Sequence, residues 1–266
     1  MSTDTPSTSP GDLFSVRGRT CVVTGGTRGI GLDMARALAA NGAEVIVTSR
    51  KADAVDAAVE ELSGLGSARG IASDLGTPAG IEGFASYVAE HADAVHVLIN
   101  NAGATWGASL GEFPEEGWDK VLDLNVKSPF FLVQALLPQL LGAASKDRPA
   151  KVVNVASVEG MRAGQMETYS YGVSKAGLIH LTEHLALQLA GRSVTVNALA
   201  PGPFATKMMR GTLDAVGEDN VAGTVPLGRL GKPEDVYAAA LLLASSASDY
   251  MTGSTIPLGG GLGPIA

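Results

Sequence analysis

The chain of 266 residues is poor in cysteine and in basic side chains. Because Cys21 is the only cysteine, neither an intrachain disulfide nor a thiolate metal cluster can form. Its apolar neighbours predict a buried, inert thiol. The formal net charge of −8 argues against nucleic-acid binding, since phosphates require a basic surface. No apolar run reaches the ~18 residues that a membrane-spanning helix needs.

The first residues also differ from a secretory signal. Residues 1–11 are rich in Ser, Thr and Pro, without the basic start and apolar stretch of a secretory signal. We therefore expect a disordered tail over 1–11 and a cytoplasmic protein. No linker-like stretch interrupts residues 12–266, which predicts one domain.

Short apolar segments alternate with longer segments of helical periodicity. The predicted strands are Thr20–Thr24, Glu44–Thr48, Gly70–Ser73, Val95–Asn100, Lys151–Ser157, Ser193–Leu199 and Ser254–Leu258. The predicted helices are Ile30–Asn41, Asp53–Leu65, Ala79–Glu90, Glu115–Leu141, Thr168–Ala190 and Pro233–Ala244. This alternation predicts an α/β fold, a Rossmann-type doubly wound parallel sheet of about seven strands flanked by helices.

A glycine-rich turn follows the first predicted strand and opens the first long helix. Gly25, Gly29 and Gly31 permit a tight turn and a close approach of backbone to a pyrophosphate. The helix N-terminus then offers unpaired N–H groups to the anion. A glycine pattern alone is weak, but its strand–turn–helix context favours dinucleotide binding.

The second predicted strand indicates which dinucleotide binds. An NAD site would carry Asp or Glu at the end of this strand, whereas this chain has Ser49 and Arg50. Arg50, together with Arg28 of the glycine turn, can pair with a 2′-phosphate. The sequence therefore favours NADP(H) over NAD(H).

Polar residues also follow the third and fourth predicted strands. Asp74 can accept a hydrogen bond from the adenine amino group, or it can cap the next helix. Asn101, Ala102 and Gly103 suit the wall of a crevice at the carboxyl edge of the sheet.

The second half of the chain carries residues suited to carbonyl reduction. Tyr171 and Lys175 share one helix face, and Ser157 ends the fifth predicted strand. A phenol with its ordinary pKa near ~10 is a poor proton reservoir at neutral pH, and a neighbouring ammonium should lower that pKa. Ser157 would orient the carbonyl oxygen. A Tyr-x-x-x-Lys spacing alone is common on helices, so this assignment depends on the glycine turn.

Together these motifs resemble the short-chain dehydrogenase/reductase family over about residues 17–261. The resemblance implies that Ser157, Tyr171 and Lys175 are catalytic, and that Asn125 holds a water in a proton relay from the lysine. It also implies that Pro201, Gly202 and Thr206 contact the nicotinamide end. The full set expected to bind the cofactor is Gly25, Thr27, Arg28, Gly29, Ile30, Gly31, Ser49, Arg50, Asp74, Leu75, Asn101, Ala102, Gly103, Tyr171, Lys175, Pro201, Gly202 and Thr206.

Within the family, segments 101–107, 117–121 and 226–229 look most like rhamnolipid-type 3-oxoacyl-carrier-protein reductases. The chain departs from the family at Gly259, where an Asp is usual. The resemblance implies an NADPH-dependent enzyme, and helices 115–141 and 168–190 imply a homotetramer or homodimer.

The substrate is expected to be a small molecule with a carbonyl. Residues 203–225 should form a lid, and Phe204, Met208 and Met209 would give it an apolar lining. Trp106, Met161 and Met166 can face the same space or pack in the core. No metal site is expected, because His180 and His184 lack carboxylate partners.

Three functions fit these residues. The first is reduction of a ketone, such as a 3-oxoacyl thioester, to a secondary alcohol with Tyr171 as proton donor. The second keeps the site but runs as an NAD(P)+-dependent alcohol or sugar dehydrogenase. The third is a non-catalytic dinucleotide-binding sensor, which the intact Ser, Tyr and Lys disfavour.

Overall fold

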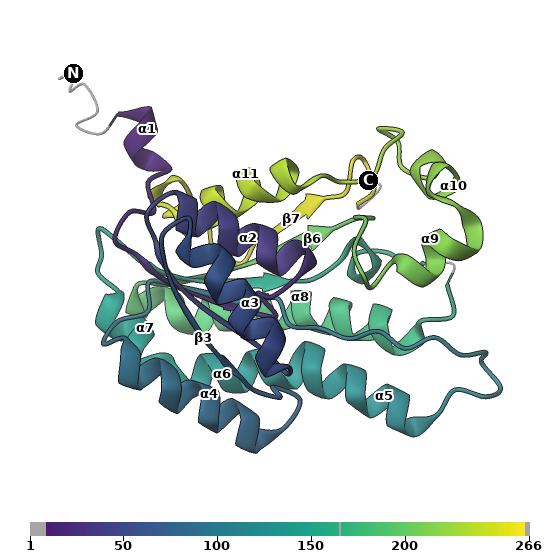
Figure 1. Ribbon diagram of the computed structural model, residues 1–266, viewed down its shortest axis with the longest axis horizontal. Helices are drawn as coiled ribbons and strands as arrows, with labels where there is room; N and C mark the ends of the chain where they lie inside the picture. The colour runs from purple at the N-terminus through teal and green to yellow at the C-terminus, as the bar shows by residue number, and fades with distance from the viewer. Residues whose placement is uncertain (1–8, 165, 264–266) are drawn as a thin grey trace.

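A computed structural model describes residues 9–164 and 166–263 (Figure 1). Its strands are β1 (Thr20–Thr24), β2 (Glu44–Ser49), β3 (Ser67–Ala72), β4 (Val97–Asn100), β5 (Ala150–Val155), β6 (Val194–Pro201) and β7 (Thr255–Leu258). All pair in parallel in the order β3-β2-β1-β4-β5-β6-β7. The predicted doubly wound parallel sheet is confirmed.

The strand order creates the place where a ligand can bind. The chain starts at β1, proceeds outward to β3, and then returns to β4 on the other side of β1. The connections after β1 and β4 therefore diverge and leave a crevice at the carboxyl ends of these strands.

Helices cover both faces of the sheet (Figure 1). The main helices are α2 (Gly29–Ala40), α3 (Ala52–Ser63), α4 (Pro78–His91), α5 (Glu115–Leu122), α6 (Ser128–Ala135), α7 (Leu137–Ala143), α8 (Tyr169–Leu189) and α11 (Pro233–Ala244). Helices α2, α3 and α11 lie on one side, and α4 to α8 lie on the other. No helix among the described residues combines the length and apolar character needed to cross a membrane.

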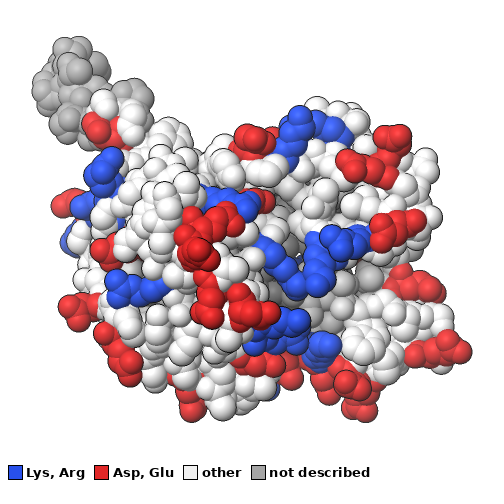
Figure 2. Space-filling model, in the orientation of Figure 1, with Lys and Arg blue, Asp and Glu red and all other residues white. Residues whose placement is uncertain are grey.

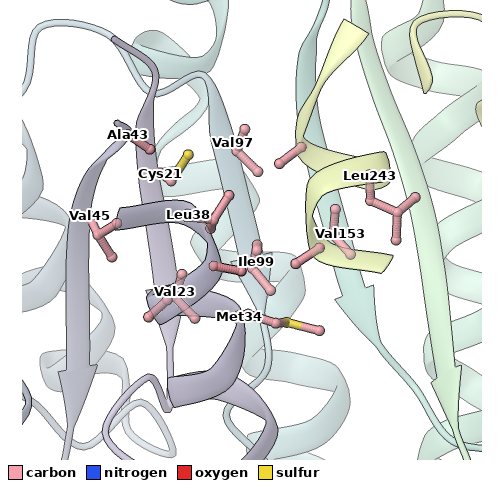
Figure 3. Close-up of a cluster of buried hydrophobic side chains, with 14 of the residues drawn as sticks. Cys21, Val23, Met34, Leu38, Ala43, Val45, Val97, Ile99, Val153 and Leu243 are labelled. Carbon is pink, nitrogen blue, oxygen red and sulfur yellow. The ribbon is translucent and has the colours of Figure 1, made fainter. Parts of the chain in front are cut away.

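The central strands are apolar along their whole length because both of their faces are covered. Cys21 and Val23 of β1 pack with Met34 and Leu38 of α2 in one core (Figure 3), while Val22 faces the opposite core. Burial raises the pKa of the Cys21 thiol to about 12, which fits the expected inert thiol.

The predicted helix over residues 115–141 is interrupted in the structure. After α5, residues Asp123–Lys127 form a π-helical turn, and α6 and α7 follow as separate helices. Pro129 and Pro138 stand in the first turns of α6 and α7. Proline lacks an N–H donor and crowds the carbonyl one turn earlier, so it favours a new helix start.

One other segment differs from expectation, and the expected lid gains detail. Pro10 and Gly11, expected in the tail, belong instead to the short helix α1 (Pro10–Leu13), where Ser9 and Asp12 form a capping box. The rest of that prediction, residues 1–8, lies outside the described residues. The expected lid contains two helices, α9 (Arg210–Val216) and α10 (Glu218–Gly223).

Candidate active site

A cavity of about 900 Å³ follows the carboxyl edge of the sheet. Figure 2 shows a hollow in this face of the molecule with Lys and Arg side chains beside it. The glycine turn, the end of β5, the start of α8 and the lid all contribute to its wall. Expected site residues that line it are Gly25, Arg28, Gly29, Ile30, Gly31, Asn101, Ala102, Gly103, Ser157, Tyr171, Lys175, Pro201, Gly202 and Thr206. Thr27, Ser49, Arg50, Asp74, Leu75 and Asn125 are not part of that lining.

The turn after β1 needs glycine for two reasons. Gly25 and Gly29 adopt positive φ angles of 64° and 52°, a region that favours glycine. A Cβ on Gly25 would also lie 3.0 Å from the Cα atom of Ala102. The backbone therefore borders the crevice without side chains, which leaves space for a bulky polyanionic ligand.

Asn101 braces this turn from β4. Its side-chain Nδ2 donates to the carbonyl oxygens of Thr24 and Gly25, at 2.9 and 3.2 Å. The Thr24 hydroxyl accepts from the backbone N–H groups of Asn101 and Ala102. The amide that we expected to contact the cofactor is thus engaged in holding the glycine turn against β4.

The N-terminus of α2 lies at the same place and suits a pyrophosphate. Arg28 is the N-cap residue but makes no side-chain cap, so the first amides of the helix are left to a ligand. Gly29, Ile30 and Gly31 line the cavity. Unpaired amides at a helix N-terminus attract phosphate oxygens.

The end of β2 offers a place for a further phosphate. The register pairs Thr24 with Thr48, which brings the residues after β1 and β2 to one edge of the sheet. Ser49 Oγ is buried and has no hydrogen-bond partner among the described residues, while Arg28 and Arg50 are exposed. An orphan hydroxyl and two guanidinium groups near this edge fit a 2′-phosphate.

Two expected adenine-side residues behave differently. Leu75 is buried in the core against α4. Asp74 is exposed, and its Oδ1 accepts from the N–H of Gly76 at 3.1 Å. Thr77, not Asp74, is the N-cap of α4. The capping alternative for Asp74 is therefore wrong, because the helix begins later than its position allows.

Ser157 and Tyr171 meet inside the cavity. Ser157 follows β5 in extended conformation, and its Oγ accepts from the N–H of Glu159 at 3.2 Å. Tyr171 stands in the first turn of α8, close enough to Ser157 for the serine side chain to affect its pKa. Burial raises the pKa of Tyr171 to about 12, although the nearby Ser157 side chain acts in the opposite direction.

Lys175 lies one turn further along α8. Its Nζ donates to the carbonyl oxygen of Val155 at 2.7 Å and lies 5.7 Å from the centroid of the Tyr171 ring. Burial lowers the pKa of this ammonium to about 8. The expected lowering of the phenol pKa is not present, because burial and then the charge of Glu159 raise it.

Asn125 lies beneath the cavity, in the π-helical turn. It is fully buried, and its Nδ2 donates to the carbonyl of Ala104 and to Ser174 Oγ, both at 2.9 Å. Its Oδ1 accepts from the N–H of Ala104 at 2.8 Å. The side chain therefore ties the π turn to the loop after β4 and to α8, next to Lys175.

The lid is anchored at its base. Phe204 is buried, and its ring occupies the space that a side chain on Gly231 would need. Phe204, Met208 and Met209 line the cavity as expected. Of the three residues with two possible positions, Met166 lines the cavity, whereas Trp106 and Met161 do not. Trp106 instead packs on Gly117, with Lys120 over its ring.

Sequence reasoning missed three titratable residues of the cavity wall, namely Glu159, Arg162 and Lys207. Glu159 lines the cavity two positions after Ser157. The sequence did contain a signal for Glu159, because a carboxylate two residues after Ser157 must lie near the same edge of the sheet.

The chain is similar in sequence to known reductases. Residues 25–263 match the family model described as enoyl-(acyl carrier protein) reductase. The rhamnolipids biosynthesis 3-oxoacyl-[acyl-carrier-protein] reductase of Pseudomonas aeruginosa is 42% identical over 249 residues, which are 93% of this chain and 97% of the relative.

Solved structures agree. The RhlG/NADP active-site complex of Pseudomonas aeruginosa matches with a TM-score of 0.91 and 41% identity, over 94% of this chain and 98% of the other. A 3-oxoacyl (acyl-carrier-protein) reductase of Agrobacterium tumefaciens with NADP bound matches with a TM-score of 0.87 and 33% identity, over 96% and 98%.

Proposed function

Because the chain belongs to the short-chain dehydrogenase/reductase family, we propose that it is an NADP(H)-dependent oxidoreductase that reduces a ketone to a secondary alcohol. The observation that carries this proposal is the position of Tyr171 and Lys175 in one cavity with the glycine turn after β1. A phenol and an amine remote from that turn could not serve redox chemistry at a nicotinamide.

The cofactor has a consistent path along the cavity. When bound, NADPH would supply the hydride for the carbonyl carbon of the ketone and would be released as NADP+. The first turn of α2 would hold the pyrophosphate, and Arg28, Ser49 and Arg50 would hold the 2′-phosphate. Pro201, Gly202 and Thr206 border the nicotinamide end.

The chain's own residues then deal with the charge that forms on oxygen. Ser157 donates a hydrogen bond to the carbonyl oxygen and orients it. The Tyr171 hydroxyl gives its proton to that oxygen as the carbonyl becomes an alkoxide, so the product is a neutral alcohol. The Lys175 ammonium stabilises the phenolate that Tyr171 becomes. Asn125 holds the π-helical turn against α8 beside Lys175, where a proton from solvent restores the Tyr171 hydroxyl.

The lining of the cavity favours a substrate with apolar parts. Beyond the catalytic residues it presents Met166, Met208, Met209, Val216 and Val221. Two of the similar proteins are named as 3-oxoacyl-carrier-protein reductases, so we place 3-oxoacyl thioesters first among the ketones to test.

The test is NADPH oxidation with acetoacetyl-coenzyme A and a set of cyclic ketones. Tyr171→Phe should bind NADPH yet lose roughly 10²–10⁴-fold in kcat, because it removes the acid. Tyr169→Phe is the matched control, since Tyr169 is exposed in the same helix turn and does not line the cavity. Normal turnover by Tyr171→Phe would refute the assigned proton donor.

We also propose that copies of the chain associate through the faces of α5, α6 and α8. Large apolar side chains are exposed there, namely Trp118, Phe130, Phe131, Val173 and Leu187. A dimer or tetramer would cover them. Sedimentation of the purified protein measures the assembly, and a monomer at micromolar concentration would contradict it. A cytoplasmic location remains the expectation from the sequence.

A further inference from the structure

A carboxyl group stands in the wall of the cavity beside the reactive hydroxyls. Glu159 belongs to the short 3-10 helix Val158–Gly160, directly after Ser157. Its backbone N–H donates to Ser157 Oγ at 3.2 Å, which fixes the residue relative to the serine. Its side chain lines the cavity.

The surroundings hold this carboxyl in place but leave it poorly hydrogen-bonded. Oε2 accepts from Thr168 Oγ1 at 3.4 Å, and a Cβ on Gly164 would lie only 3.2 Å from the Glu159 carboxyl carbon. Burial raises the pKa of Glu159, and its charge helps to raise the pKa of Tyr171. Among the described residues this is the one hydrogen bond to its carboxylate, so acceptor capacity remains for a ligand.

No cation of the cavity neutralises Glu159 within the described part of the chain. Arg162 and Lys207 line the same cavity, but both are exposed, and neither forms an ion pair with Glu159 among residues 9–164 and 166–263. Glu159 is partly withdrawn from solvent, and a carboxylate in that position with few hydrogen-bond donors is destabilised. A substrate that donates a hydrogen bond to it would offset that destabilisation.

The charges of the cavity select the kind of donor. Besides Arg28, which is assigned to the cofactor, Arg162, Lys175 and Lys207 line the cavity, so a cationic substrate would be repelled. A neutral hydroxyl gains a hydrogen bond to the carboxylate without that repulsion.

We infer that Glu159 is a specificity-determining residue that accepts a hydrogen bond from a hydroxyl group on the ketone substrate. This inference rests on the proposed function and narrows it. The preferred substrates are then ketones that carry a hydroxyl beside an otherwise apolar skeleton, and an unsubstituted acyl chain or ring leaves Glu159 without a donor.

Matched ketones test this directly. We would measure kcat/KM in NADPH oxidation with 2- and 4-hydroxycyclohexanone and with 2- and 4-methylcyclohexanone, which replace the hydroxyl by a methyl of similar size. A hydrogen bond to a charged group predicts that the wild-type enzyme prefers one hydroxy ketone over its methyl partner by roughly tenfold to a hundredfold. Glu159→Gln should reduce the ratio several-fold, and Glu159→Val should abolish it.

The control is Glu167→Gln, the same change at an exposed residue of the same loop that does not line the cavity. It should keep the wild-type ratio. A wild-type ratio near one for both pairs, or a ratio that survives in Glu159→Val, overturns the inference and leaves the proposed function standing. Failure of the wild-type enzyme to oxidise NADPH with any ketone, acetoacetyl-coenzyme A included, overturns both.

Discussion

Two buried lysines lie near opposite ends of β5, Lys151 in the strand itself and Lys175 on α8, and they differ in their partners. Lys151, at the amino end, is 1% exposed, and its Nζ pairs with Asp249 at 2.7 Å. Lys175, on α8 beside the carboxyl end of β5, donates to the carbonyl oxygen of Val155 and has no carboxylate partner among the described residues. Burial lowers the pKa of both ammonium groups, but Asp249 opposes that effect at Lys151.

The comparison separates a structural charge from a reactive one. A carboxylate partner fixes the proton on Lys151 and makes it part of the framework. Without one, Lys175 has a pKa of about 8 and can respond to events at the neighbouring phenol. The amino edge of the sheet therefore contributes to stability, and the carboxyl edge to chemistry.

The largest expected effect is at the reactive lysine. Lys175→Met should lower kcat for ketone reduction roughly 10²–10⁴-fold, because the phenolate of Tyr171 loses its stabilising charge. The same change should raise the free energy of unfolding at neutral pH, by roughly 1–3 kcal/mol, because it removes an ammonium that burial disfavours. Stopped-flow kinetics and urea unfolding measure the two. Lower stability with intact turnover would reverse the assignment of the two edges.

At the amino edge of the sheet a substitution should affect stability and leave turnover unchanged. Asp249→Asn leaves the Lys151 ammonium buried without its partner and should cost about 3 kcal/mol in the free energy of unfolding. Because the pair lies far from the cavity lining, kcat per folded molecule should be unchanged. Adding Lys151→Met to this variant should recover much of the loss. No recovery would mean that the carboxylate has another structural role.

Arg50 sharpens the comparison at the carboxyl edge, because it should affect binding alone. Arg50→Ala should weaken NADPH binding roughly tenfold to a hundredfold and NADH binding far less, since only NADPH carries the 2′-phosphate. Thermal unfolding without cofactor should match the wild-type protein, because Arg50 is exposed. Titration calorimetry with both cofactors measures the ratio, and equal losses for both would defeat the NADP(H) assignment.

The smallest effect concerns pH and the amino edge. His96 Nδ1 accepts from the N–H of Thr20 at 3.0 Å, so this atom carries no proton in the fold. Burial, followed by the charges of Arg19 and Arg148, lowers the pKa of His96. The folded protein thus binds this proton less readily than the unfolded chain. The stabilisation is complete above the ordinary pKa of ~6.5 and is lost as pH falls toward the lowered value.

The loss should be roughly 1 kcal/mol of unfolding free energy between pH 7 and 5, the value of one hydrogen bond. His96→Asn keeps an acceptor near the position of Nδ1 but does not titrate, so its stability should fall less over this range. Urea unfolding at several pH values provides the comparison. An identical slope in both proteins would exclude His96 as the source.

The sequence predicted the architecture well, because continuous Val and Ile runs and helical spacing are local signals. The strands Thr20–Thr24 and Glu44–Ser49 end within one residue of expectation. The same holds for the placement of Ser157, Tyr171 and Lys175 in one cavity, since the edge of a parallel sheet gathers whatever follows its strands.

What failed depends on contacts between distant segments. Lys151 of β5 pairs with Asp249 in the loop before β7, and no local sequence pattern predicts this pairing. The brace from Asn101 to the glycine turn is equally non-local. The direction of the Tyr171 pKa was missed because spacing on a helix reports proximity to Lys175 but not the depth of burial.

The construction of the lid limits how it can move. Phe204 at its start is locked over Gly231, and Val225 at its end is buried against Gly260. Between α9 and α10, Gly217 has a φ of 84°. We therefore expect the lid to stay attached at both ends and to bend at Gly217. Substrate entry would then require a local movement of α9 and α10, while the sheet stays in place.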